Sequence, residues 1–173
     1  MAQIGVVPDE VAPADTDETP FRDENPRLYA ERIAAAKADA VVRPGAFVLA
    51  ADTVVAAGRR ILPKTEDEPA ARSCLTLLSG RRHRVLTALV LRGPDGRRAT
   101  RLNESVVAFH RLTAEQIDAD LASEEWRGKA GGYAIQGRAA AHIRFISGSY
   151  SGVVGLPLFE TAQLLRGLGW PLP

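Results

Sequence analysis

Two long strand-like stretches in the middle of the sequence, joined by a tight turn, limit the folds open to this chain. Apolar and polar residues alternate over 83–92 and 99–109, and Pro94-Asp95-Gly96 between them is typical of a hairpin. Helical patterns lie on both sides of the pair. Because the hairpin interrupts a pure strand–helix–strand series, the sequence predicts an α/β fold with a mixed sheet, not a doubly wound parallel sheet.

The remaining elements are predicted from periodicity and from capping residues. Asn25-Pro26 has the composition of a helix start, and Thr65 with Glu68 and Thr113 with Gln116 have the spacing of capping boxes. In chain order we expect an extended segment over 3–12, a helix over about 26–42, a buried strand over 47–51 that resumes at 54–55, a short segment at 61–62, helices from 65 to about 78 and from 113 to about 122, a strand over 142–146 and a closing helix over 156–168.

Composition excludes several classes of protein. The 173 residues contain 46% hydrophobic residues, enough for the core of one domain, and no linker or repeat is visible. A formal net charge of +1 argues against a dedicated nucleic-acid binder. The single cysteine and the three scattered histidines do not have zinc-site spacing. No apolar run approaches the roughly 20 residues of a membrane helix, and the start does not resemble a signal peptide, so we expect a cytoplasmic protein without nucleic-acid or membrane partners.

Asp52 is the first candidate for catalysis. It follows the buried apolar run 47–51 and is followed by Thr53. Ligands of open α/β sheets bind near the carboxyl ends of strands, and a carboxylate there could bind a metal or accept a proton from water. The alternative is an acid that accepts backbone hydrogen bonds in a turn.

Acidic and basic residues elsewhere could complete a site for a metal and an anion. Glu18 lies in an acidic loop, and magnesium prefers oxygen ligands; the alternative is a solvated loop. Lys37, Lys64 and Lys129 could contact phosphates as point charges. Lys37 lies on an otherwise apolar helix, where its side chain either snorkels to solvent, the commoner outcome, or reaches into a cleft.

The glycine-rich stretch over 128–137 is a candidate ligand loop. Its glycines would let backbone N–H groups approach an anion, although the order of a P-loop is absent. The amide of Gln136 offers a donor and an acceptor, which complement the O4 and N3–H edge of uracil or thymine. A second, hydroxyl-rich loop over 147–152 could contact a ligand or be a simple turn.

Taken together and in order, these segments resemble the Maf family, also called septum-formation inhibitor homologues. The resemblance covers nearly the whole chain and rests on an ordered set of short strings. They are Asp17-Glu18-Thr19, Ala36-Lys37-Ala38, Ala51-Asp52-Thr53-Val54-Val55, Leu78-Ser79-Gly80-Arg81, Gly128-Lys129-Ala130-Gly131 through Gln136-Gly137, and Gly148-Ser149-Tyr150-Ser151 followed by Val153-Val154-Gly155-Leu156-Pro157.

The resemblance implies an elongated mixed β-sheet with flanking helices, folded into two lobes around a cleft. It also implies a divalent metal, Mg²⁺ or Mn²⁺. It implies an enzyme, a nucleoside triphosphate pyrophosphatase of the dTTP/UTP-preferring branch that also removes modified nucleotides. By resemblance Asp52 accepts the proton of the attacking water, and Glu18 and Asp52 hold the metal. The phosphate contacts would come from Lys37, Lys64 and Lys129, and the base contacts from Thr53 and Gln136. The expected partner is the nucleoside triphosphate, and a homodimer is one assembly open to the chain.

The sequence also departs from the family pattern. Family members begin with an apolar strand and a Ser-x-x-Arg-Arg-type loop, and neither is present in residues 1–173. We therefore expect one domain over 1–173 that is incomplete at its N-terminus. Gly152 stands where the family has Asn, and Pro63-Lys64-Thr65 replaces Gly-Lys-Pro. These departures leave an alternative open, a catalytically impaired nucleotide-binding or cell-division regulatory protein.

Overall fold

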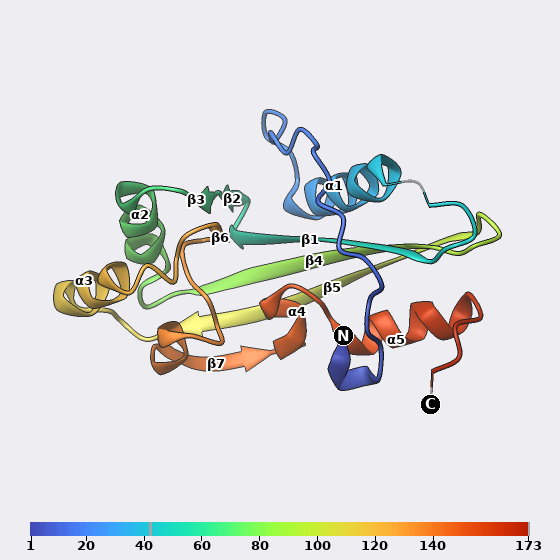
Figure 1. Ribbon diagram of the computed structural model, residues 1–173. Coiled ribbons are helices and arrows are strands. Elements are labelled where there is room, and N and C mark those ends of the chain that lie inside the picture. Colours follow the sequence, from blue (N-terminus) through green and yellow to red (C-terminus); the bar gives the residue numbers. More distant parts are fainter. Residues whose placement is uncertain (42, 173) are drawn as a thin grey trace.

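A five-stranded sheet with helices on both faces forms the frame of the protein (Figure 1). The computed structural model describes residues 1–41 and 43–172. The elements in chain order are η1 (Ala2–Ile4), α1 (Pro26–Ala40), β1 (Val48–Ala57), β2 (Arg60–Leu62), β3 (Lys64–Thr65), α2 (Glu68–Leu78), β4 (Arg82–Arg92), β5 (Arg98–Phe109), α3 (Ala114–Ala122), β6 (Lys129–Ala130), η2 (Arg138–Ala141), β7 (Ile143–Ser147), α4 (Tyr150–Val154) and α5 (Leu158–Gly167).

The predicted hairpin is confirmed and forms the centre of the sheet. The strand order is β2-β1-β4-β5-β7, and β4 pairs with β5 from Arg82–Ala108 to Arg92–Arg98. The α/β class with flanking helices is also confirmed. The sheet is antiparallel throughout its described ladders, whereas we expected a mixed one, because β1 reaches β4 through the excursion β2–β3–α2 and not through a crossover helix. A parallel pairing occurs in the isolated bridge between Thr65 and Arg127.

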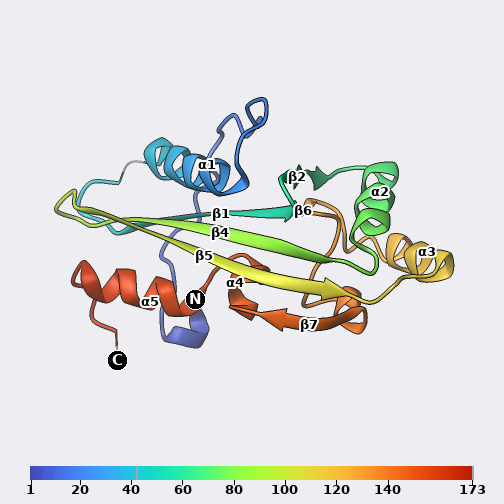
Figure 2. The ribbon, with the colours of Figure 1, turned by 180° about the vertical axis from the view of Figure 1, so that it is seen from behind.

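The pleat of the sheet assigns residues to three apolar clusters. Val54, Leu86 and Ala88 face α1, where they pack against Ile33 and Ala34. Leu89 and Leu91 lie on the opposite face and pack against α5. The start of β4 and the end of β5 pack with α2, α3 and Trp126 in a separate cluster. Figure 2 shows α1 and α5 on opposite sides of the long strands, with α2 and α3 at one end.

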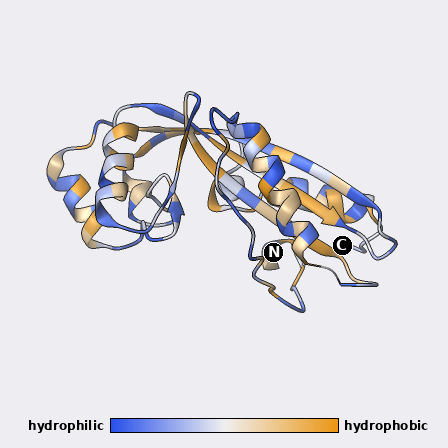
Figure 3. Ribbon diagram, turned by 90° about the horizontal axis from the view of Figure 1, so that it is seen from above, coloured by the Kyte–Doolittle hydropathy of each residue, from blue (hydrophilic) through white to orange (hydrophobic). Residues whose placement is uncertain are grey.

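The structure therefore has two lobes connected by the long strands, as the resemblance implied (Figure 3). One lobe contains α1 and α5 around the sheet, and the other contains α2, α3, β3 and β6. Within the described residues no helix has both the length and the apolar character needed to cross a membrane.

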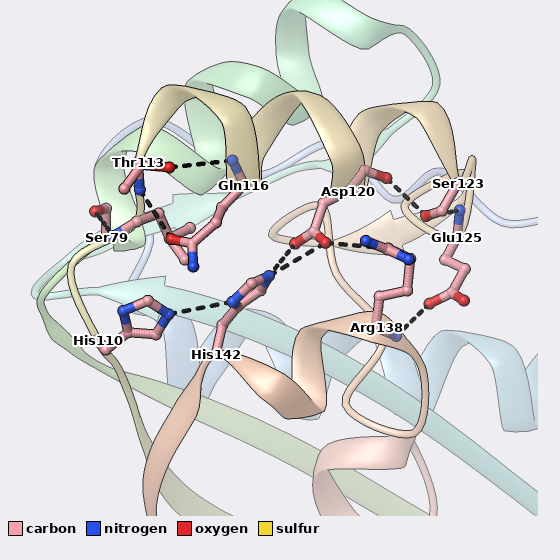
Figure 4. A network of polar contacts seen from close by, with 10 residues as sticks. Ser79, His110, Thr113, Gln116, Asp120, Ser123, Glu125, Arg138 and His142 are labelled. Atoms are coloured by element: carbon pink, nitrogen blue, oxygen red, sulfur yellow. Dashed lines mark hydrogen bonds and ion pairs between the residues drawn. The ribbon is translucent and has the colours of Figure 1, made fainter.

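Two expectations about the second lobe have different outcomes. The capping box of Thr113 and Gln116 is confirmed at the start of α3 (Figure 4). The capping box at Thr65 is wrong, because the N-cap of α2 is Asp67, whose carboxylate accepts from the Ala70 amide at 2.8 Å. Thr65 belongs to β3 instead, and its buried hydroxyl donates to the carbonyl of Trp126 at 2.7 Å.

A polar network ties α3 to the strands of the second lobe (Figure 4). The buried Asp120 carboxylate contacts His142 Nε2 at 3.1 Å, and His142 Nδ1 lies 3.2 Å from His110 Nε2. Arg138 approaches the same carboxylate at 3.5 Å. These side chains connect α3 with the ends of β5 and β7.

The chain ends differ in detail from the expectation. Residues 2–4 form a 3-10 turn where we expected an extended segment. The closing helix begins at Leu158, not at 156, because Pro157 is its N-cap. The loop over 147–152 contains the start of a further short helix, α4, capped by Ser149, whose hydroxyl accepts from the Gly152 amide at 3.0 Å. The helix α1 ends at Ala40; residue 42, the expected end, lies outside the described residues.

Candidate active site

Two adjoining cavities, of about 270 and 200 Å³, lie between the lobes and share Asp52, Thr53 and Lys64. They wrap around the edge of β1, because β2 pairs with β1 only from Val55 onward and, within the described residues, no other strand covers 48–54 on that side. Successive side chains of a strand point to opposite faces. Asp52 therefore lies on the face covered by α1, whereas Thr53 lies on the other face.

Asp52 and Lys37 form a buried ion pair at the α1 face. The Lys37 ammonium donates to the Asp52 carboxylate at 2.7 Å, and the two side chains are 17% and 3% exposed. The helical period of α1 places Lys37 one turn beyond Ile33 and Ala34, which pack on the sheet. Lys37 thus extends along the sheet toward the strand edge and lines the first cavity, whereas the commoner outcome for a lysine on an apolar helix is snorkelling to solvent.

Glu18 connects this pair to the second lobe. Its carboxylate accepts from Lys37 at 2.8 Å through one oxygen and from Lys64 through the other. Lys64 lies on β3, so the bridge spans the space between the lobes. Asp17, next to it, is used differently: its carboxylate accepts from the Thr19 amide at 2.9 Å and shapes the turn.

The loop that carries Glu18 has no regular secondary structure, and α1 holds it in place. Tyr29 donates its hydroxyl to the Glu18 carbonyl at 2.7 Å, and Arg32 donates to the Thr19 carbonyl at 3.1 Å. Arg32 also binds the Glu24 carboxylate at 2.7 Å and lies over the ring of Phe21, 4.1 Å from its centroid. These contacts fix the backbone on both sides of the Glu18 side chain.

The charges of the site perturb one another. Burial raises the pKa of Asp52, although the hydrogen bond from Lys37 acts against it. Burial acts to lower the pKa of Lys37, but its hydrogen bonds to Asp52 and Glu18 outweigh burial and raise that pKa. For Glu18, burial acts to raise the pKa, and the hydrogen bonds from Lys37 and Lys64 lower it overall. A carboxylate with a raised pKa at a cavity is suited to proton transfer.

The glycine-rich loop forms the opposite wall of the first cavity. Its backbone is tied to the second lobe by Gly128 N to Thr65 O at 2.8 Å and Gly131 N to Pro63 O at 3.0 Å. Gly131 has a φ of +72°, and a Cβ there would stand 2.8 Å from Val55 Cγ1. Only glycine permits this approach of the loop to β1.

Gln136 and Lys129, both predicted as ligands, line this cavity as exposed side chains. Gln136 makes no hydrogen bond to the part of the chain that the structure describes, so its amide is available to a ligand. Tyr133, from the same loop, is buried and bonded to His83 Nε2 at 2.8 Å. The loop is therefore anchored by Tyr133 while its polar side chains stay at the cavity.

Thr53 is held by a second threonine behind it. Thr87 is the residue of β4 directly opposite Thr53, and the two hydroxyl oxygens are 3.0 Å apart. Thr87 also donates to the Gly152 carbonyl at 2.8 Å. A Cβ on Gly155, another residue of the cavity wall, would stand 3.7 Å from the Thr53 hydroxyl, so the absent side chain keeps that side of the hydroxyl open.

The structure thus brings all seven sequence-predicted residues to one pair of cavities. Lys37, Asp52, Thr53, Lys64, Lys129 and Gln136 line the first cavity, and Glu18 lines the second. Tyr29, Arg32 and Thr87 support the site, and sequence reasoning missed them. A signal existed for Thr87, since it interrupts the apolar run of β4 with a polar side chain in register with Thr53.

Residues 1–168 match the sequence model of a family described as Maf-like protein. The chain belongs to the Maf family. The resemblance first suggested by short strings is thereby confirmed over nearly the whole sequence.

Several curated relatives of this Maf-family chain carry the same name. The chain is 63% identical over 172 residues to the "dTTP/UTP pyrophosphatase" of Rhodospirillum rubrum, and the match covers 98% of this chain and 82% of the relative. It is 59% identical to the proteins of the same name from Granulibacter bethesdensis and Caulobacter vibrioides, covering 98% of this chain and 87% and 89% of those relatives.

Proposed function

We propose that this protein hydrolyses dTTP and UTP to the nucleoside monophosphate and pyrophosphate. The observation that carries the proposal is the joint placement of the buried carboxylate of Asp52 with two lysines and with the polar side chains of Thr53 and Gln136, in cavities at one strand edge. The names of the relatives support the same activity. Modified pyrimidine nucleotides would be further substrates, which gives the enzyme a house-cleaning role in the cytoplasm.

In this proposal the α1 face handles the phosphates. Lys37 and Lys64, which neutralise Glu18 and Asp52 in the free protein, offset the charge of the triphosphate, and Lys129 adds a third cation from the opposite wall. Asp52 takes the proton of the attacking water as the bond between the α- and β-phosphates breaks and pyrophosphate leaves. Because burial raises the pKa of Asp52, this carboxylate is a stronger base than an ordinary exposed one.

A divalent metal, Mg²⁺ or Mn²⁺, is part of the proposal. Glu18 and Asp52 contact one ammonium at 2.8 and 2.7 Å, so their oxygens converge on a single positive centre. Mg²⁺ is commonly bound by one or two carboxylates together with substrate phosphates and water, and this pair fits that requirement. No group of three or more His, Cys, Asp or Glu side chains able to hold a metal occurs in the described residues. A bound cation would offset negative charge on the triphosphate.

The opposite face of β1 handles the base in this proposal. Gln136 can pair with the O4 and N3–H edge of uracil or thymine through its acceptor and donor. Thr53 faces the same cavity. A site built to hydrogen-bond one base edge rejects bases with a different donor and acceptor order, because its polar groups would be left unpaired.

Pyrophosphate release tests the proposal. Wild-type protein is assayed with UTP, dTTP, CTP, ATP and GTP in Mg²⁺ or Mn²⁺, and release should be fastest with UTP and dTTP. Asp52→Asn should lower release by about 10²-fold or more while a nucleotide-induced rise in melting temperature persists. Asp118→Asn, an exposed carboxylate on α3 paired with Arg72, is the matched control and should keep full activity.

The competing proposal, a catalytically silent nucleotide binder or division regulator, makes the opposite forecast. It requires that UTP and dTTP raise the melting temperature of the wild type with no pyrophosphate release in either metal. Assembly as a homodimer is a separate prediction, which light scattering on the eluting protein tests; a monomer at assay concentration contradicts it.

A further inference from the structure

The donor and acceptor roles at the Thr53 hydroxyl can be worked out from its contacts. A hydroxyl has one proton to donate and two lone pairs that accept. The Gly152 carbonyl can only accept, so the 2.8 Å contact requires the proton of Thr87. Thr87 then has no proton left for Thr53. The 3.0 Å contact between the two hydroxyls must therefore use the proton of Thr53, with Thr87 as the acceptor.

The surroundings of Thr87 make this assignment firm. Thr87 is 1% exposed, on a strand in the middle of the sheet, so exchange of its partners with bulk water is blocked. The two threonines are directly opposite one another in the β1–β4 ladder, which places their side chains next to each other. The Gly152 carbonyl is fixed as well, because it also accepts from the Gly155 amide at 3.1 Å.

We infer that Thr87 is a positioning residue for base selection, which makes Thr53 present lone pairs alone to the cavity. With its proton directed backward, Thr53 can accept a hydrogen bond from the ligand but cannot donate one. The inference rests on the proposed function and extends it to a residue that does not touch the substrate. Through Thr87, the strand β4 takes part in base recognition, although Thr87 is not a lining residue of either cavity.

The chemical consequence is a preference between pyrimidines. Uracil and thymine carry one N–H donor at N3, which the Gln136 amide oxygen and an acceptor-only Thr53 hydroxyl can share in a three-centre hydrogen bond, whereas cytosine carries a lone pair at N3. A lone pair facing a lone pair leaves both without a partner in a site that excludes water, and such mismatches are costly. Thr87 thus favours UTP and dTTP over CTP by removing the option that Thr53 turns its proton to the base.

Substitution of Thr87 tests the inference through a ratio of rates. The ratio of kcat/KM for UTP to that for CTP is measured for wild type, Thr87→Val and Thr87→Ser. Thr87→Val frees the Thr53 proton, so the ratio should fall by about tenfold. Thr87→Ser keeps the hydroxyl and should keep the ratio. The double variant Thr53→Val/Thr87→Val should have the ratio of Thr53→Val alone, because Thr87 acts through Thr53.

A matched control separates positioning from a general loss of stability. Thr161 is 0% exposed on α5, its hydroxyl donates to the Pro157 carbonyl at 2.8 Å, and neither residue lines the two cavities. Thr161→Val removes the same kind of buried bond and should leave the UTP/CTP ratio unchanged. All comparisons are made below the melting temperature of each variant.

The outcomes are distinct. If Thr87→Val loses activity equally toward UTP and CTP while Thr53→Val alters their ratio, Thr87 has only a structural role and the inference is overturned. If the wild type itself releases no pyrophosphate or does not prefer UTP to CTP, the proposed function fails first, and the inference fails with it. A lowered ratio restored by serine supports the inference.

Discussion

Removing the Lys37 ammonium should destabilise the fold mainly through Asp52. In Lys37→Met the carboxylate of Asp52, 3% exposed, keeps its burial but loses the ammonium at 2.7 Å. Coulomb's law gives about 6 kcal/mol for such a pair at an effective dielectric constant of about 20, and desolvation of both charges offsets part of it. Loss of one partner of a buried pair costs about 3 to 5 kcal/mol. Because Lys37 is 17% exposed, we expect a loss of about 3 kcal/mol.

A double-mutant cycle isolates this effect. Free energies of unfolding are measured in urea at pH 7 for wild type, Lys37→Met, Asp52→Asn and the double variant. Once Asp52 is neutral, Lys37→Met should cost only about 1 kcal/mol, which gives a coupling of about 2 kcal/mol. A loss in Lys37→Met that is under about 1 kcal/mol, or equal in both backgrounds, would refute the reasoning.

The pH dependence of Lys37→Met provides an independent check of sign. Burial raises the pKa of Asp52 above 3.8, and loss of Lys37 raises it further. The folded state then binds a proton that the unfolded state releases, so the stability deficit of the variant relative to wild type should shrink as the pH falls toward 3.8. A constant deficit relative to wild type between pH 7 and pH 4 contradicts an uncompensated Asp52 charge.

Two further predictions concern the loop and its anchor. Gly131→Ala should lose about 3 kcal/mol of stability, because a side chain at φ +72° meets Val55. The control Gly96→Ala has a φ of +82° but open space around it, and it should lose only about 1 kcal/mol. Equal losses in urea unfolding would contradict the steric argument. Burial lowers the pKa of His83 from 6.5 to about 4, because the buried ring is disfavoured in its charged form. The stability that the neutral ring contributes to the folded state is therefore complete above pH 6.5 and is lost as the pH falls toward 4. From pH 7 to pH 5 this one group should remove about 2 kcal/mol, and His83→Gln should abolish that part of the acid sensitivity; a variant as acid-sensitive as the wild type argues against it.

Local patterns in the sequence predicted the parts of the fold that depend on neighbours along the chain. The hairpin over 82–109 follows from alternation and one turn, and α3 follows from its capping box. The helix start at Thr65 was wrong because a competing N-cap, Asp67, lay two residues on and a long-range bond to Trp126 held Thr65 in a strand. Tertiary contacts of this kind leave no local signal.

The site shows the same division. The strings shared with the Maf family pointed to Asp52, Lys37, Glu18 and Gln136, and the structure brings them together. The supports could not be found in that way, because each acts across a distance in sequence. Tyr29 bonds a carbonyl 11 positions earlier, and Thr87 bonds one 65 positions later. The packing of α1 and α4 against the sheet creates those contacts.

Asp52 and Thr53 are consecutive residues at an uncovered strand edge, and this position has a consequence for how mutations affect the enzyme. One peptide bond separates the group proposed for chemistry from the group proposed for selection, and the pleat turns them to opposite faces. Substitutions near Thr53 can therefore retune the preferred nucleotide without touching the reactive carboxylate. An inserted or deleted residue between Val48 and Asp52, by contrast, would exchange the two faces and abolish both tasks at once.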